Sequence, residues 1–126
     1  MQSVHTQTAQ ISFIKEGIVL LKFKDGIEYE KHHAQENLEA ESKLAGGQKY
    51  LSLVDCRCNL LVDAKTHAFL ASEEAAKYRI AVAILLDTLA VRLSSGFYIG
   101  HYQPIVPTKI FTNQEEAIQW LLTFKK

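Results

Sequence analysis

Apolar and polar residues alternate near the N-terminus in the manner of β-strands. Residues 18–24 have the period of a half-buried strand. One side of this run carries Val19, Leu21 and Phe23, and the other carries Leu20, Lys22 and Lys24. Residues 10–15 form a second β-rich run, so the two runs predict an antiparallel hairpin, with a turn at 25–26 after it. We expect residues 1–9 to be a poorly ordered or edge segment.

Three later runs also predict strands. They are YLSLVD at 50–55, IAVAILL at 80–86 and TKIFT at 108–112. IAVAILL has no polar residue, which predicts a central strand covered on both faces.

Spacings of three and four residues predict helices between these strands. The segments are 31–45, stopped by Gly46–Gly47; 64–78, which can break near Ser72; 89–102; and the residues after Thr112, which forms a capping box with Glu115. The inward-facing residues are expected to be Ala34, Leu38, Leu44 and Ala45 in the first helix and Ala117, Trp120, Leu121 and Phe124 in the last.

Strands that alternate with helices need crossover connections and therefore a largely parallel sheet. The order of elements predicts one α/β domain over residues 1–126. Its sheet is mixed, mostly parallel and five-stranded, with an antiparallel N-terminal hairpin and four helices.

Composition and charge narrow the class of protein. Fourteen basic and fourteen acidic residues cancel, so no face for nucleic acid is expected. The polar start MQSVHTQTAQ lacks the features of a signal peptide, and the run at 80–86 is too short to span a bilayer. Two cysteines two positions apart form no disulfide framework, so we expect a protein of the reducing cytoplasm without a transmembrane segment.

Residues 52–69, SLVDCRCNLLVDAKTHAF, hold the candidate reactive groups. Cys56 and Cys58 have the wrong spacing for a C-x-x-C redox pair, although Arg57 between them could activate a thiol. We expect both cysteines to be buried free thiols. His67 is expected to be packed or half-exposed in its helix and not to act as a base.

Metal and cofactor signals are weak. His32–His33 offers at most one metal ligand to a given face, is typical of a solvated helix start, and predicts no metal site. The sequence contains no phosphate-binding loop, dinucleotide-binding motif or nucleophile elbow. We therefore expect no catalytic residue and no cofactor.

The segment LAVRLSSGFYIGHYQPIVP gathers aromatic residues in a predicted helix. Phe97, Tyr98 and Tyr102, with Arg92, are the candidate binding surface or pocket. A helix buries one side against a sheet, and apolar residues run most of the way round this one. Accessible aromatic residues would suit a partner surface or an apolar pocket. The alternative is that the loop before Pro104 folds back and covers them, and the sequence leaves both open.

Several motifs resemble those of an uncharacterised bacterial STAS/SEC14-like family, whose members are similar to anti-sigma-factor antagonists. The marks are a V-D at the end of YLSLVD, A-S-E-E in the second helix, the apolar strand that ends at Asp87, and P-T-K-I-F-T before E-A-I-Q-W-L. The likeness covers residues 10–124. It implies a STAS-like fold and a regulatory, protein-binding role.

In phospho-regulated STAS domains, a D-S-S-G-like motif carries the phosphorylated serine at the start of the second helix. On this sequence the motif's aspartate falls on Asp63, its serines on Ala64 and Lys65, and its glycine on Thr66. The acceptor serine is missing, and Thr66 lies one helical position away, a rotation of about 100°. We therefore expect no phospho-switch, Asp63 as the helix N-cap, and Lys65 as a charge that could attract an anion.

Three functions follow, in order of preference. The first is a non-enzymatic STAS-like binding or regulatory module that contacts a protein partner or a second copy of itself. The alternative is a carrier or sensor of a small apolar ligand such as a lipid. The least favoured is an enzyme that uses Cys56 or His67.

Overall fold

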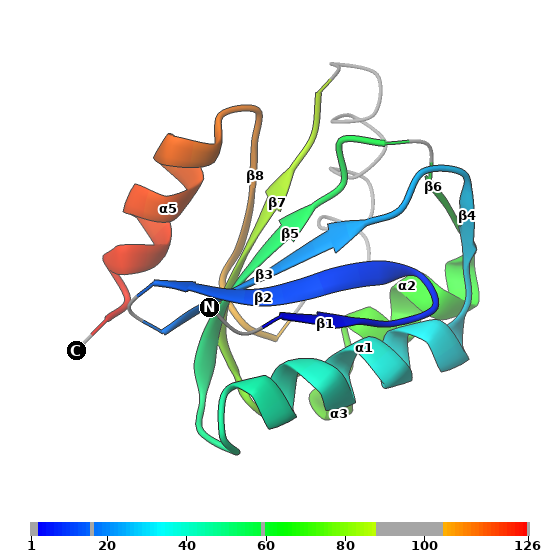
Figure 1. The fold of residues 1–126 in the computed structure, drawn as a ribbon, viewed down its shortest axis with the longest axis horizontal. Helices are drawn as coiled ribbons and strands as arrows, with labels where there is room; N and C mark the ends of the chain where they lie inside the picture. The colour runs from blue at the N-terminus through cyan, green and yellow to red at the C-terminus, as the bar shows by residue number, and fades with distance from the viewer. Residues whose placement is uncertain (1–2, 16, 59, 88–104, 126) are drawn as a thin grey trace.

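A mixed β-sheet forms the centre of the molecule (Figure 1). The computed structural model describes residues 3–15, 17–58, 60–87 and 105–125. In the described residues the sheet has six strands in the order β1-β2-β3-β5-β7-β8. Their bounds are β1 (Ser3–His5), β2 (Ala9–Lys15), β3 (Ile18–Phe23), β5 (Tyr50–Asp55), β7 (Arg79–Leu85) and β8 (Thr108–Phe111).

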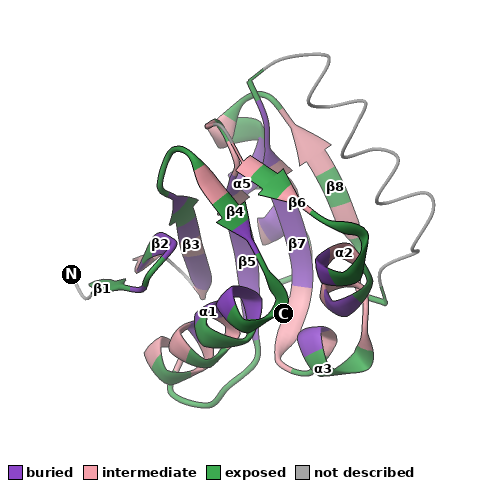
Figure 2. Ribbon diagram, turned by 90° about the vertical axis from the view of Figure 1, so that its right-hand side faces the viewer, coloured by how far each residue is buried: buried purple, intermediate pink, exposed green. Residues whose placement is uncertain are grey.

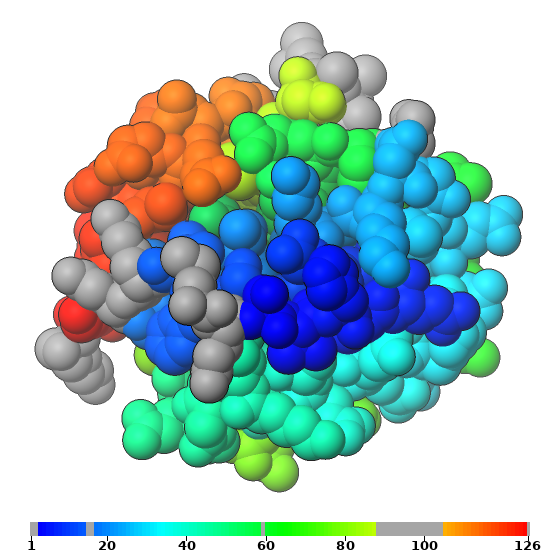
Figure 3. All heavy atoms as spheres, viewed as in Figure 1, coloured from blue at the N-terminus to red at the C-terminus, as the bar shows by residue number. Residues whose placement is uncertain are grey.

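The hairpin of β2 and β3 is antiparallel and the pairs β3–β5, β5–β7 and β7–β8 are parallel, as predicted. The additional pair of β1 with β2 is also antiparallel. The sheet has one strand more than the five expected, because β1 pairs with β2 at the edge. Every residue of β1 is exposed, and Figure 3 shows the dark blue N-terminal strands at the surface beside α1 (Lys31–Leu44). Three residues are too few for alternation to indicate a strand.

A second, two-stranded parallel sheet was not predicted. It joins β4 (Ile27–Tyr29) to β6 (Leu60–Val62) and lies over one face of the main sheet (Figure 2). Both strands are only three residues long, so no periodicity distinguishes them from loops.

Helices cover both faces of the sheet (Figure 1). α1, α2 (Ala64–Leu70) and α3 (Glu73–Ala76) lie on one face, and α5 (Gln114–Leu122) lies on the other. The predicted break near Ser72 is confirmed, because the Ser72 side chain caps α3 by accepting from the backbone N–H of Ala75. The predicted helix over 89–102 lies outside the described residues. None of the described helices has the length and apolar character needed to cross a membrane.

Alternate residues of each inner strand enter two separate cores, one on each face of the sheet. On the α5 face, Leu53 of β5 and Ala83 of β7 are fully buried. β7 lies between β5 and β8, so it is an inner strand, although β3 and β5 form the middle of the sheet.

The last helix begins one residue later than predicted. Asn113, and not Thr112, is its N-cap, and the Asn113 side chain accepts from the backbone N–H of Glu116 at 2.9 Å. The predicted capping box of Thr112 and Glu115 is therefore wrong. Of the four residues expected to face inward, Ala117 and Leu121 are buried, and Trp120 and Phe124 are half-buried against the α5-side core.

The buried face of α1 also differs from the prediction. Of the four residues expected there, Ala34 is buried, while Leu38, Leu44 and Ala45 are only half-buried. The other buried residues of α1 are polar: His33, Asn37 and Glu41. They recur every four residues and so line one side of the helix. This polar face helps to form the candidate site.

Candidate ligand-binding site

A cavity of about 960 Å³ lies between the main sheet and the layer that holds α2, α3 and the β4–β6 sheet. Its floor includes a row of aliphatic side chains that runs across three neighbouring strands. The strand register places Leu21 of β3 beside Val54 of β5, and Val54 beside Ile84 of β7.

The apolar floor is partly accessible although it belongs to inner strands. Val54 and Ile84 are half-buried, whereas Leu53 and Ala83 beside them, on the opposite face, are fully buried. Side chains of β4, β6, α2 and α3 complete the apolar lining with Ile27, Leu60, Val62, Leu70 and Ala75. The sheet face below the cavity is thus apolar, and the described residues leave it partly open.

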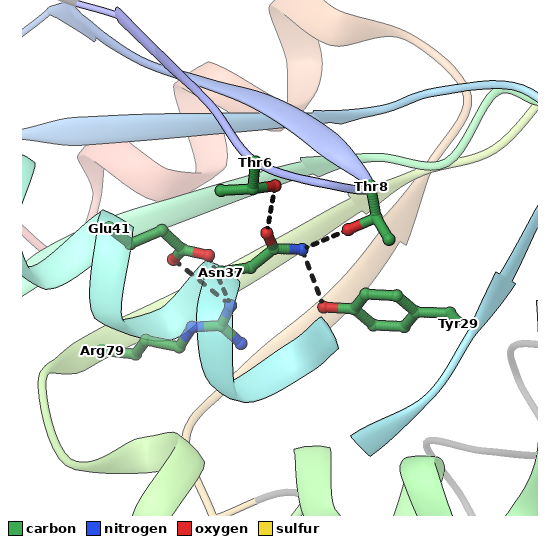
Figure 4. Close-up of polar contacts among 6 residues, drawn as sticks. All are labelled: Thr6, Thr8, Tyr29, Asn37, Glu41 and Arg79. Atoms are coloured by element: carbon green, nitrogen blue, oxygen red, sulfur yellow. Dashed lines mark hydrogen bonds and ion pairs between the residues drawn. The ribbon is translucent and has the colours of Figure 1, made fainter. Parts of the chain in front are cut away.

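A buried polar network, centred on Asn37 of α1, adjoins one end of the cavity (Figure 4). The Asn37 Nδ2 donates to the hydroxyl of Tyr29 at 3.1 Å and to Oγ1 of Thr8 at 3.0 Å. Its Oδ1 accepts from Oγ1 of Thr6 at 2.5 Å. Tyr29 and Thr8 line the cavity, so Asn37 fixes the positions of two cavity hydroxyls. Burial raises the pKa of Tyr29, and the hydrogen bond with Asn37 opposes this only in part.

A buried ion pair lies one helical turn further along α1. Nη2 of Arg79 donates to both carboxylate oxygens of Glu41 at 3.3 Å, and their side chains are 9% and 0% exposed. Burial alone would lower the pKa of Arg79, but the charge of Glu41 and the interactions with Tyr50 and Tyr29 together outweigh this effect and raise it. Arg79 therefore stays charged, and it lines the cavity at the start of β7. Tyr50 lies beside the pair, and burial together with the charge of Glu41 raises the pKa of Tyr50.

His33 is part of this polar end and is not a solvated residue, which corrects the prediction for His32–His33. Its side chain is 8% exposed, and Nδ1 accepts from the backbone N–H of Glu30 at 3.1 Å. The ring stacks on Tyr29 with 6.2 Å between ring centroids. His32, by contrast, is exposed at the helix surface.

The cysteines lie in the cavity wall near the ends of β5 and β6. Cys56 and Cys58 are free and half-buried, where full burial was expected. Burial raises the pKa of each thiol. Arg57 does not activate them, because its guanidinium binds both oxygens of Asp55 at 3.0 and 2.9 Å. This geometry favours unreactive thiols.

The motif-equivalent switch region lies mostly apart from the cavity. Asp63 is the N-cap of α2, as predicted, and accepts from the backbone N–H of Thr66 at 2.8 Å. Lys65 is exposed, but Thr66 is only 1% exposed, so its hydroxyl is not accessible to a kinase in the folded chain. His67, the next residue, is half-buried and lines the cavity. Burial lowers the pKa of His67.

The predicted aromatic surface is not placed by the structure. Phe97, Tyr98, Tyr102 and Arg92 lie outside the described residues. Their role as a partner surface or pocket wall stays a prediction.

Sequence reasoning missed the polar end of the cavity. The residues concerned are Thr8, Tyr29, His33, Asn37, Glu41 and Arg79. A usable signal was present in the four-residue spacing of His33, Asn37 and Glu41, and in an arginine that directly precedes an apolar run. A polar stripe on a helix normally indicates a solvated face, so this spacing does not by itself indicate a buried site.

The fold and cavity define an α/β protein with a mixed sheet and a candidate site for a small ligand. A family model described as "Domain of unknown function (DUF7793)" matches residues 12–125, and the chain belongs to this family. No curated protein matches it. One solved structure that it resembles is the crystal structure of a protein with unknown function from Arthrobacter sp. FB24 at 2.20 Å resolution. The two chains are 22% identical over 88% of this chain and 96% of that chain, with a TM-score of 0.29.

Proposed function

We propose that this chain is a non-enzymatic binding module that carries or senses a small, mainly apolar molecule. The observation that carries the proposal is the cavity of about 960 Å³, with an aliphatic floor and polar groups gathered at one end. Sites for small molecules commonly have volumes of 300 to about 1,000 Å³ and combine apolar walls with a few placed polar groups.

The chemistry of the wall favours binding over catalysis. Cys56 and Cys58, the candidate nucleophiles, have raised pKa values, so little thiolate is present at neutral pH. Arg79 and Glu41 hold each other in a buried pair. These groups can shape and orient a ligand, and none is arranged as a nucleophile activated by a base.

A STAS-like regulatory role is compatible with this proposal. The mixed sheet with its antiparallel hairpin supports the STAS-like resemblance, and the burial of Thr66 supports a form of the domain without a phospho-switch. In this scheme the protein acts in the bacterial cytoplasm, and a partner protein or a second copy binds at the aromatic segment over 89–107. That segment lies mainly outside the described residues, so the proposed function rests on the cavity and not on the aromatic segment.

Fluorescence titration with N-phenyl-1-naphthylamine, an uncharged dye that emits in apolar surroundings, tests the proposal. The wild-type chain should bind it saturably. Ile84→Trp fills part of the cavity floor and should weaken binding about tenfold, equivalent to about 1.4 kcal/mol.

Leu20→Trp is the matched control, because Leu20 is also a half-buried aliphatic residue of an inner strand but packs on the α5 face. This variant should bind the dye as the wild type does. A wild-type chain without saturable binding, or equal binding by Ile84→Trp and Leu20→Trp, would exclude the cavity as the site.

A further inference from the structure

Donor groups surround the polar end of the cavity. The hydroxyl oxygens of Tyr29 and Thr8 each accept a hydrogen bond from Asn37 Nδ2, so each hydroxyl keeps its own proton to donate. Nδ1 of His33 accepts from the backbone N–H of Glu30, which places the proton of the neutral ring on Nε2. All three side chains line the cavity.

Arg79 adds a fourth donor. One terminal nitrogen, Nη2, binds both oxygens of Glu41, and the other points away from Glu41 in Figure 4. Arg79 belongs to the cavity wall, whereas Glu41 lies behind it. A guanidinium has donors but no acceptor. Arg79 and the Nε2 of His33 can only donate, so the ligand group that meets them must accept hydrogen bonds, which the hydroxyl protons of Tyr29 and Thr8 can also supply.

The charges at this end already balance. Glu41 neutralises Arg79, and Nδ1 of His33 accepts a hydrogen bond from the backbone N–H of Glu30, so this nitrogen carries no proton. The carboxylate of Glu28 lies exposed at the cavity rim. An anionic ligand would bring an uncompensated charge into a buried site, which is costly. A cationic ligand would meet Arg79 and has no acceptor to offer.

We infer that the ligand is a mainly apolar molecule with an uncharged hydrogen-bond acceptor, such as an ester, ketone or amide carbonyl, an inference that rests on the proposed function. The acceptor oxygen lies among Arg79, Tyr29 and Thr8, and the apolar part lies along the row of Leu21, Val54 and Ile84. One such molecule accepts hydrogen bonds at the polar end of the cavity and covers its apolar floor.

Displacement of N-phenyl-1-naphthylamine by three probes of similar chain length tests this ligand class. The probes are methyl decanoate, decanoate and decylamine, used at a pH at which the acid and the amine are charged. Methyl decanoate should bind the wild-type chain at least tenfold more tightly than either charged probe. If decanoate or decylamine binds as tightly as the ester, the inference is wrong while the proposed function stands. If no probe displaces the dye, or if the dye does not bind, the proposed function itself fails.

The double variant Glu41→Gln/Arg79→Met separates hydrogen bonding from simple apolar partition, because it removes the donor and its counter-charge together. It should bind methyl decanoate about tenfold more weakly than the wild type. The control is Glu39→Gln/Lys43→Met, which removes the exposed ion pair on the same helix and should leave binding unchanged. Unchanged affinity of the Glu41→Gln/Arg79→Met chain for the ester would overturn the role of Arg79. If that variant does not fold in a thermal unfolding scan, the wild-type ranking of the three probes decides the inference.

Discussion

Removal of Arg79 should be one of the most damaging single changes in this protein. In Arg79→Met, the carboxylate of Glu41 keeps its fully buried position but loses the Nη2 donor that contacts both of its oxygens at 3.3 Å. Loss of one partner from a buried ion pair costs about 3–5 kcal/mol. The whole free energy of unfolding of a small protein is about 5–15 kcal/mol, so the variant should be marginally folded at neutral pH.

Replacing both partners should cost less than the sum of the two single changes. Glu41→Gln leaves the buried guanidinium without its carboxylate, whereas Glu41→Gln/Arg79→Met removes both charges. We expect a coupling energy on the order of 2 kcal/mol between the two sites.

Urea unfolding, followed by circular dichroism, measures each free energy of unfolding. The slope against denaturant concentration shows whether the variants unfold from a similarly compact state. Lys43→Met is the matched control, because Lys43 pairs with Glu39 on the same helix with both side chains more than 70% exposed, at 78% and 72%. That change should cost less than about 0.5 kcal/mol. If Arg79→Met costs no more than Lys43→Met, the buried pair does not stabilise the fold as described.

Three further predictions concern the core and the end of β5. Leu53→Asp would place a charge at a site that is 0% exposed and should abolish cooperative unfolding, and a cooperatively folded variant would contradict the position of the α5-side core. Burial opposes ionisation of Asp55, but hydrogen bonds from Arg57 outweigh it and lower the pKa of Asp55. This carboxylate therefore contributes stability above its ordinary pKa of about 3.9, and the contribution is lost as the pH falls through the lower folded value. Asp55→Asn should lose about 1 kcal/mol at pH 7 and should approach the wild type at acid pH, and a difference independent of pH would refute this. Cys56 and Cys58 should react with a thiol reagent much more slowly at neutral pH than after unfolding in urea, and equal rates would show that the raised pKa values and partial burial are wrong.

Local patterns were sufficient for much of the sheet. The alternation over 18–24 predicted the hairpin of β2 and β3, and the apolar runs predicted β5 and β7. Side chains of a strand alternate between two faces whatever lies above them, so this signal is contained in a few adjacent residues. Signals at helix ends are local too, which is why the N-cap role of Asp63 and the helix break near Ser72 were predictable.

Strands too short to show repeated alternation, which needs about four residues, were not predictable. β1, β4 and β6 have three residues each, and their hydrogen bonds go to segments that only the folded chain brings near. Leu60 and Val62 are apolar, but this short pattern fits a loop equally well until the neighbouring strand is known. The two-stranded sheet that roofs the cavity is thus a product of tertiary structure.

The sequence by itself determined the order of the main strands and the hairpin, whereas the strand register of the folded chain aligned the apolar row across β3, β5 and β7. Tertiary structure decided which side of α1 faces inward. A helix with apolar residues on one stripe and polar residues on another can bury either, and the usual preference is for the apolar stripe. Here Asn37 and Glu41 are buried because Thr8, Tyr29 and Arg79, distant in sequence, supply their hydrogen bonds and counter-charge. A buried polar group is stable only with such partners, and they come together only when the chain has folded.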